Sequence, residues 1–159
     1  MGYFISRRWA MPIIASAVLL SGVAGCGTSG GTGSQANEQL FRAATAGNVV
    51  AIEGAIAAGA DVNAVDYSKS TNGRRALNYA ALNNRPDAIR ALVAAGAQIN
   101  LANNTGFTPL HHAAEAGSVD AARALLELGA DKTLRHGGGL TPLQVADESN
   151  HPEVADVLR

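Results

Sequence analysis

The stretch that decides the fold is Thr-Pro-Leu-His-His-Ala-Ala at residues 108–114. Thr-Pro-Leu-Gln-Val-Ala, at residues 141–146, repeats it 33 positions later, and Arg-Ala-Leu-Asn-Tyr-Ala-Ala, at residues 75–81, precedes it by the same interval. A fourth and more divergent copy is Leu-Phe-Arg-Ala-Ala at residues 40–44. Self-similarity at a fixed interval of this length indicates small units that stack on one another and bury a shared core.

A second marker supports the repeat independently. Gly-Ala-Asp-Val-Asn at residues 59–63 returns as Gly-Ala-Gln-Ile-Asn at 96–100 and as Gly-Ala-Asp at 129–131, with spacings of 37 and 33. The copies of the other motif show the same two spacings, because Leu40, Leu77 and Leu110 are 37 and 33 residues apart. Because both markers are displaced by the same four residues, the second unit contains an insertion, which lies between Asp66 and Arg75.

Each unit has the signals of two short helices joined by a tight turn. In the third unit, Thr108 is placed to cap a helix, and Pro109 stands at the first helical position, where its missing N–H costs nothing. Gly117 is expected to end this helix in the left-handed conformation, and Gly129 to end a second helix. The equivalent residues at the end of the first helix in the other units are Gly47, Asn84 and Asn150.

Thr-Pro-Leu-His, Ala-Ala and Gly-Ala-Asp-Val-Asn are motifs of the ankyrin repeat, and the chain resembles an ankyrin-repeat protein over residues 37–159. The resemblance implies an all-α solenoid of about four helix–turn–helix units with short β-hairpin fingers. The second unit departs from the family, because Arg75 and Asn78 replace the Thr and His whose side chains hydrogen-bond in other ankyrin repeats. That side-chain pair is therefore expected to be missing. The expected units cover residues 37–66, 67–103, 104–136 and 137–159.

The start of the chain has the pattern of an export signal. Arg7 and Arg8 precede an apolar stretch, residues 12–24, that is too short and too interrupted by Gly and Ser to predict a transmembrane helix. The stretch ends in Val-Ala-Gly-Cys, which resembles the lipobox of bacterial lipoprotein precursors. The resemblance implies that a signal peptide of residues 1–25 is removed and that lipid is attached to Cys26.

The residues after Cys26 predict a tether. Residues 27–34 contain only Gly, Ser and Thr, so residues 26–36 are expected to be a lipidated cysteine and a flexible linker. A lipid-anchored chain exported from a bacterial cell faces the periplasm, and Gly27 in place of Asp favours the outer membrane under the sorting rule of enteric bacteria. Ser6 before the two arginines also resembles a twin-arginine signal, so the export route stays open.

Composition and spacing exclude several function classes. The formal charge is −1, and removal of the signal peptide would leave 10 basic and 13 acidic side chains, which does not suggest nucleic-acid binding. With one cysteine there is no intramolecular disulfide. The adjacent His111 and His112 point about 100° apart on a helix and cannot chelate one ion together. No nucleophile elbow or phosphate-binding loop is present, so we expect no enzymatic activity, cofactor or metal.

The resemblance also implies where a partner binds. In ankyrin stacks the finger tips and the exposed side of the first helices form the contact surface. Tyr79 and Phe107 are expected to matter most, because exposed aromatic side chains favour binding; the alternative is that they cover the stack between neighbouring fingers. Basic side chains on the long finger suggest an acidic partner. The predicted partner-binding residues are Tyr67, Lys69, Arg74, Tyr79, Leu82, Asn83, Phe107, His112, Glu115 and Leu140.

Together these patterns predict a monomeric, membrane-tethered protein–protein interaction module in the periplasm, acting as an adaptor or an inhibitor. Resemblance to exported bacterial ankyrin proteins implies two candidate roles, which are support of a stress-defence enzyme of the envelope and immunity against a secreted toxin. A structural lipoprotein of the envelope is a third interpretation. The sequence does not choose among them.

Overall fold

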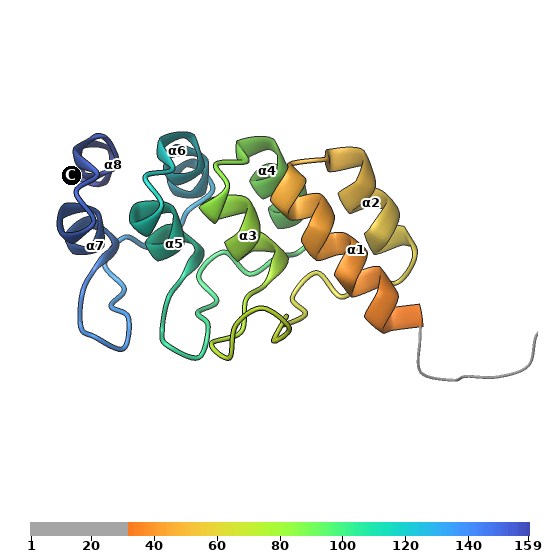
Figure 1. The fold of residues 1–159 in the computed structure, drawn as a ribbon. Helices are drawn as coiled ribbons and strands as arrows, with labels where there is room; N and C mark the ends of the chain where they lie inside the picture. The colour runs from red at the N-terminus through yellow and green to blue at the C-terminus, as the bar shows by residue number, and fades with distance from the viewer. Residues whose placement is uncertain (1–31) are drawn as a thin grey trace, which may run out of the picture.

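The computed structural model describes residues 32–159 (Figure 1). The predicted signal peptide and the predicted lipidation site, Cys26, lie outside the described residues. Residues 32–159 form eight α-helices and no extended strand. The helices are α1 (Thr32–Ala46), α2 (Val49–Ala57), α3 (Ala76–Leu82), α4 (Pro86–Ala94), α5 (Pro109–Glu115), α6 (Val119–Glu127), α7 (Pro142–Glu148) and α8 (Pro152–Leu158).

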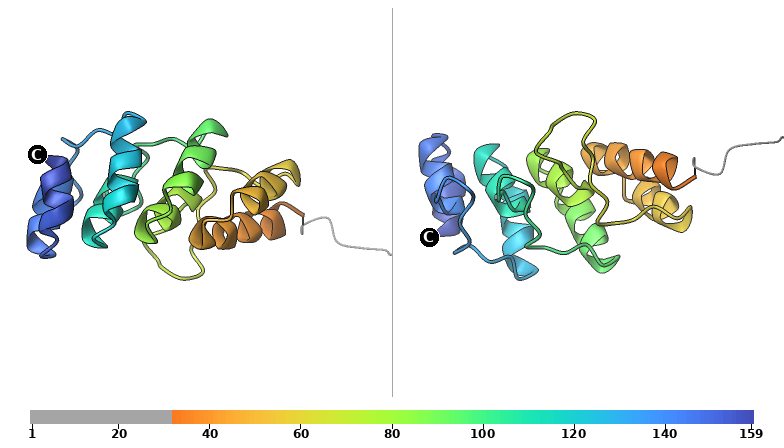
Figure 2. Two further views of the ribbon diagram at one scale, coloured as in Figure 1. Left: turned by 90° about the horizontal axis from the view of Figure 1, so that it is seen from above. Right: turned by 90° about the horizontal axis from the view of Figure 1, so that it is seen from below.

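The helices form two parallel rows (Figure 1 and Figure 2). Helices α1, α3, α5 and α7 pack against one another in order and form the inner row, while α2, α4, α6 and α8 form the outer row. Each inner helix also packs on the outer helix that follows it in the chain. Every unit thus buries its apolar side against its neighbours, as in a helical solenoid, and the predicted all-α stack of four units is confirmed.

Three loops project from the inner row on one side of the stack (Figure 1). We call them the first finger (residues 59–75), the second finger (residues 96–108) and the third finger (residues 129–141), each of which follows the C-cap residue of an outer helix, Ala58, Ala95 or Leu128. The first finger contains one antiparallel bridge, in which Asp66 and Arg74 exchange main-chain hydrogen bonds of 2.7 and 3.0 Å. Within the described part of the chain the expected β-hairpins are therefore reduced to single contacts between the two sides of a finger.

The predicted helix ends are confirmed. The hydroxyl groups of Thr108 and Thr141 accept hydrogen bonds from the main-chain N–H three residues later, which caps α5 and α7. Asn84 and Asn150 adopt φ values of 51° and 58°, the left-handed conformation that asparagine tolerates better than most residues. These caps let the inner helices α3, α5 and α7 end after seven residues, about two turns, and let the chain reverse direction.

The core is built from small and branched residues that recur between units. Leu92, Leu125 and Leu158 stand at equivalent positions of successive outer helices, and all three are almost fully buried. Alanines, such as Ala81 and Ala114, line the contacts between inner helices and have no exposed surface. Because alanine allows close approach of two helix backbones, neighbouring units pack tightly despite few aromatic residues.

Asparagine side chains link the units near the base of the fingers. The Oδ1 atom of Asn37 accepts a hydrogen bond of 2.8 Å from the main chain of Asp61. That bond lies within the first unit, whereas Asn63 and Asn100 accept in the same way from the main chain of the following unit, at 3.0 and 2.9 Å. This ladder satisfies main-chain N–H groups that no helix uses, and it fixes the spacing between units.

Helix α1 differs from the expected start of the repeat region. It begins at Thr32, five residues before the predicted boundary at residue 37, so the end of the predicted linker is helical. Within this extension Ala36 is 4% exposed, which shows that packing as well as propensity holds the helix. No helix among residues 32–159 is both long enough and apolar enough to span a membrane.

Candidate partner-binding surface

The finger side of the stack brings together most of the predicted binding residues, at different depths. Tyr67, Lys69, Asn83 and Glu115 are exposed there, and Tyr67 keeps 57% of its surface. The half-buried members of the predicted set are Arg74, Leu82, Phe107 and Leu140. Tyr79 and His112 are buried, with 5% and 3% of their surfaces exposed, which differs from the expectation that both face solvent.

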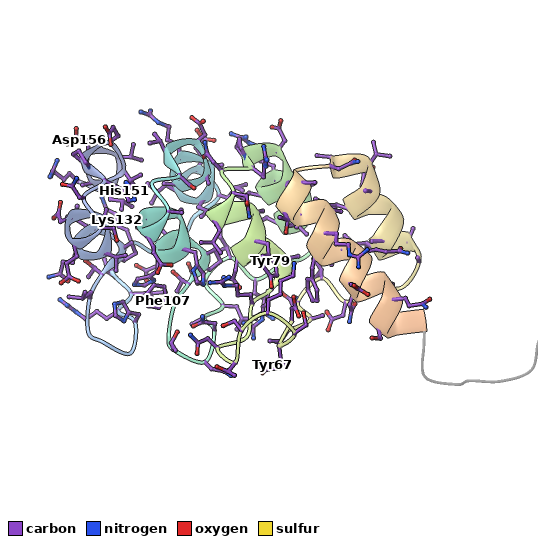
Figure 3. All side chains as sticks on the ribbon, in the orientation of Figure 1. Tyr67, Tyr79, Phe107, Lys132, His151 and Asp156 are labelled. Atoms are coloured by element: carbon purple, nitrogen blue, oxygen red, sulfur yellow. The ribbon has the colours of Figure 1, made fainter. Side chains whose placement is uncertain are left out.

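Tyr79 is buried because the first finger folds back over α3 (Figure 3). Its hydroxyl group donates a hydrogen bond of 2.7 Å to Oδ2 of Asp66, and its ring lies 6.0 Å from the ring of Phe41. The ammonium group of Lys69 lies 5.6 Å from the centre of the Tyr79 ring, a cation–π contact. Burial and the neighbouring carboxylate raise the pKa of Tyr79 to about 12. Tyr79 therefore holds the first finger against α3.

Asp66 is the other half of this anchor. Desolvation alone would raise the pKa of its carboxyl group, but hydrogen bonds from Ser68 and Tyr79 and the charge of Lys69 hold that pKa below its ordinary value. The carboxylate accepts from the Ser68 main chain at 2.8 Å as well as from the tyrosine. Both oxygens are thus satisfied within the fold, which indicates a structural role and not a free general base.

Phe107 fills the space between the second and third fingers. Its ring stacks on His136 of the third finger, with centroids 4.5 Å apart, and lies 5.3 Å from the His112 ring. A hydrogen bond of 2.8 Å from the main chain of Gly137 to the carbonyl group of Thr105 joins the same two fingers. Phe107 thus covers the stack between neighbouring fingers, so two of the three predicted aromatic residues, Tyr79 and Phe107, pack within the fold, and Tyr67 is the exposed one.

The two adjacent histidines have different surroundings. The Nδ1 atom of His111 lies 2.8 Å from the Thr108 hydroxyl, and its Nε2 atom lies 3.1 Å from the carbonyl oxygen of Leu140. Burial lowers the pKa of His111 below its ordinary value, so the neutral ring holds the second and third fingers together.

The His112 ring has no hydrogen bond of good geometry to any residue that the structure describes. Its Nδ1 atom lies 3.4 Å from a carboxylate oxygen of Glu115. The neighbouring imidazole is the main cause that lowers the pKa of Glu115, which is therefore an anion at the edge of the surface. A narrow notch of about 80 Å³ lies beside these residues and is also lined by Arg74 and Asn103.

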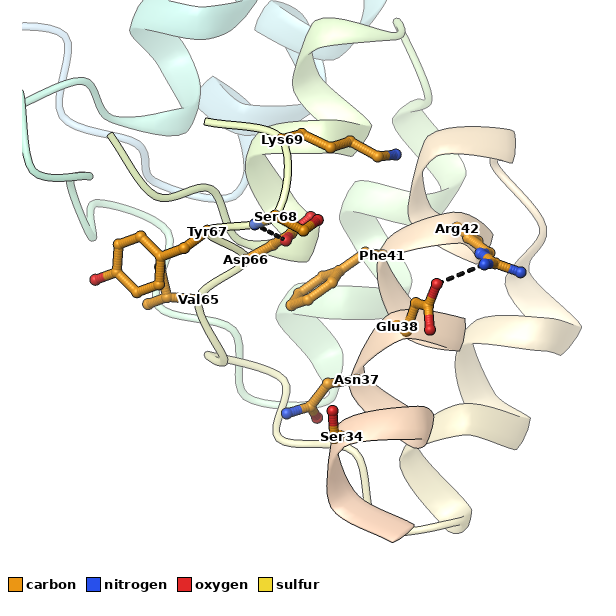
Figure 4. Close-up of a pocket in the computed structure, with 10 residues that line it drawn as sticks. All are labelled: Ser34, Asn37, Glu38, Phe41, Arg42, Val65, Asp66, Tyr67, Ser68 and Lys69. Atoms are coloured by element: carbon orange, nitrogen blue, oxygen red, sulfur yellow. Dashed lines mark hydrogen bonds and ion pairs between the residues drawn. The ribbon is translucent and has the colours of Figure 1, made fainter. Parts of the chain in front are cut away.

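A larger hollow of about 690 Å³ opens between α1 and the first finger (Figure 4). Tyr67 and Lys69 follow from the sequence as residues of this finger, but the wall that faces them does not. That wall comes from α1 and includes Asn37, Phe41 and Arg42. The insertion between Asp66 and Arg75 was the available signal, because a longer finger can reach across to the neighbouring inner helix.

Most titratable side chains beside the two concavities have a partner within the fold. Among residues 32–159 no group of three or more histidine, cysteine, aspartate or glutamate side chains could hold a metal ion. Asp66, Tyr79 and His111 are buried and have hydrogen-bond partners, whereas the buried His112 ring has the Glu115 carboxylate beside it at 3.4 Å. What remains available is an open surface of mixed polarity, which suits contact with another macromolecule.

Comparison with known proteins identifies the repeat. No curated protein matches the sequence. The family model described as "Ankyrin repeats (3 copies)" matches residues 40–136, which is more than half of the chain. Residues 137–159 lie outside this match, but α7 and α8 repeat the caps and the packing of the preceding unit. The chain belongs to the ankyrin-repeat family.

Proposed function

We propose that this protein is a membrane-tethered adaptor or inhibitor in the periplasm, which binds another protein through its fingers and inner helices and has no catalytic activity of its own. Ankyrin repeats indicate a protein–protein interaction module. The finer parts of the proposal, the tether and the compartment, rest on the sequence of residues 1–26.

The observation that carries the binding role is the hollow beside the first finger. Tyr67 at its edge is, with Val50 and Leu128, one of the large apolar side chains that stay exposed between residues 34 and 159. Val50 and Leu128 belong to the outer row, so the finger side alone combines an exposed aromatic ring with a concavity. Exposed aromatic side chains beside a concavity are typical of protein-binding surfaces.

The tether follows from Val-Ala-Gly-Cys at residues 23–26 and from the basic and apolar segments before it. A lipid on Cys26 would hold the stack close to a membrane surface. Since α1 begins at Thr32, few residues separate the proposed lipid from the first helix. The hollow lies at the end of the stack where α1 begins, because α1 forms one of its walls.

The binding role is tested by affinity purification of the full-length protein from detergent-solubilised membranes. A partner that binds the finger side should co-purify with the wild type and should be reduced at least about tenfold by Tyr67→Ser. Val50→Ser is the matched control, since it removes an exposed apolar side chain from the outer row and should leave co-purification unchanged. Equal losses in both variants would contradict a binding surface on the finger side.

The tether is tested by Cys26→Ser. The variant lacks the thiol that takes the lipid, so it should leave the membrane fraction or accumulate as an unprocessed precursor. Fractionation of cells, followed by mass measurement of the protein, distinguishes these states. A variant that is processed normally and stays fully in the membrane would refute the lipid anchor without affecting the binding proposal.

A further inference from the structure

We propose that the hollow between α1 and the first finger binds an extended segment of the partner protein that carries an apolar side chain next to a carboxylate. This inference rests on the proposed binding function and assigns that function to one site. The hollow, of about 690 Å³, falls within the size range of roughly 300–1,000 Å³ that is usual for ligand pockets.

An apolar side chain fits the inner wall of the hollow. The Phe41 ring borders it from α1, is 9% exposed, and is held in place against Tyr79. Tyr67 stands at the outer edge with its ring turned away from Phe41 (Figure 4). A segment that crosses the first finger would therefore meet one aromatic ring inside the hollow and a second where it leaves.

The charges of the hollow favour a carboxylate. Glu38 and Arg42 form an ion pair with each other, and the Asp66 carboxylate already accepts two hydrogen bonds. Lys69, in contrast, has no carboxylate within 4.0 Å among residues 34–159, and its side chain is exposed at the rim. A partner carboxylate near Lys69 would gain a charge-assisted contact without displacing an existing one.

The main chain of the finger favours an extended segment. Asp66 uses its N–H and C=O groups to bridge Arg74, but the corresponding groups of Val65 and Tyr67 bond to no other described residue. Both residues line the hollow. A peptide in extended conformation presents alternating N–H and C=O groups along its edge and could pair with these, as in the addition of a strand to an existing hairpin.

The test is selection from a displayed library of random peptides on purified, immobilised full-length protein. The proposal predicts enrichment of peptides in which an apolar residue neighbours Asp or Glu. Ser34→Trp should abolish their binding, because a large side chain on α1 would fill the hollow without removing any contact described above. Lys69→Glu should weaken their binding at least about tenfold by replacing attraction with repulsion.

Two matched variants control for nonspecific effects. Gln39→Trp adds the same bulk to α1, at a position that does not line the hollow, and should bind the selected peptides as the wild type does. Arg123→Glu makes the same charge reversal on the outer helix α6 and should also be silent. Substitution of Pro at successive peptide positions should weaken binding where the peptide N–H pairs with the finger.

Several results would overturn the inference. These are no enrichment over the starting library, enrichment of basic peptides, and peptides that bind the Ser34→Trp variant as well as the wild type. Binding only after deletion of residues 27–31 would show that the chain itself occupies the hollow. Peptides lost on Arg74→Glu but kept on Ser34→Trp would move the site to the notch between the fingers. In that case the proposed function would stand. Failure of any partner to co-purify would instead contradict both the proposed function and the binding site in the hollow.

Discussion

At the scale of single residues, buried polar side chains decide how the fingers are held. Asp66 and Tyr79 bond to each other under the first finger, while His111 bonds to Thr108 and to the carbonyl group of Leu140. In each case a polar group that would be costly to bury alone has a partner on a different segment. Removing one partner should therefore loosen a finger more than it affects the helices.

The Asp66–Tyr79 contact gives the first prediction. Tyr79→Phe keeps the ring but leaves a carboxylate oxygen of Asp66 without its donor, so we expect a loss of about 1–3 kcal/mol in the free energy of unfolding. Urea unfolding of the full-length protein measures it. Tyr67→Phe is the control, because that hydroxyl group has no partner among the described residues. Equal effects of the two substitutions would argue against the anchor.

His111 gives a prediction about pH. Its folded pKa lies below the ordinary value of 6.5, so protons bind preferentially to the unfolded chain. The resulting stabilisation is complete above pH 6.5 and is lost as pH falls from there towards the folded pKa. His111→Gln does not titrate, and a glutamine at this position can cap with Thr108 as Gln144 does with Thr141. The unfolding free energy of this variant should fall less than that of the wild type between neutral pH and pH 5. If the unfolding free energies of the two proteins changed by the same amount over this range, the prediction would be contradicted.

The sequence predicted the helix caps, which depend on local geometry. It did not predict which side chains the fingers bury. The caps at Thr108 and Thr141 and the left-handed Asn84 follow from residue type and position alone. Tyr79 and His112 occupy helix positions at which the repeat pattern predicts that side chains face solvent. Their burial depends on how neighbouring loops fold over them, which the spacing of a motif does not encode.

At the scale of elements, the second unit departs from the family in a way that the structure compensates. As expected, the side chains of residues 75 and 78 do not pair: Asn78 accepts a hydrogen bond of 2.8 Å from the Arg75 main chain, and its Nδ2 atom has no partner in the described part of the chain. The Arg75 guanidinium group instead donates to the carbonyl oxygens of Asn63, at 3.2 Å, and Ala102, at 2.9 Å. One long side chain thus joins the first and second fingers.

Arg75→Ala should therefore destabilise the protein by about 2 kcal/mol, because two charge-assisted hydrogen bonds between fingers are lost. Thermal unfolding of the full-length protein tests this. Arg123→Ala, at an exposed position on an outer helix, should change the stability by less than about 0.5 kcal/mol. If both substitutions had the same small effect, Arg75 would not be a link between the fingers.

Prediction of the elements themselves was accurate except at the start of α1. The eight helices follow from apolar spacing and from proline and threonine at helix starts. The early start of α1 was missed because residues 27–34 are all Gly, Ser or Thr, a composition that favours a linker over a helix. The buried Ala36 and the contact between Asn37 and Asp61 override that preference.

At the scale of the whole molecule, the two sides of the stack have different properties. The outer helices pack on one another and present isolated polar and apolar side chains to solvent. The finger side carries the hollow, the notch and the cross-links between fingers. Because the fingers are bonded to one another, the surface is largely preorganised, and binding should cost little ordering entropy.

The most direct measurement of this asymmetry is site-specific photocrosslinking in intact cells. A photoreactive residue at position 67 or 140 lies on the finger side, and one at position 50 or 128 lies on the outer helices. We expect one discrete adduct of the same mass from both finger positions and none from the two outer positions. Adducts of equal yield from all four positions, or adducts from the outer positions alone, would contradict a binding surface built by the fingers and inner helices.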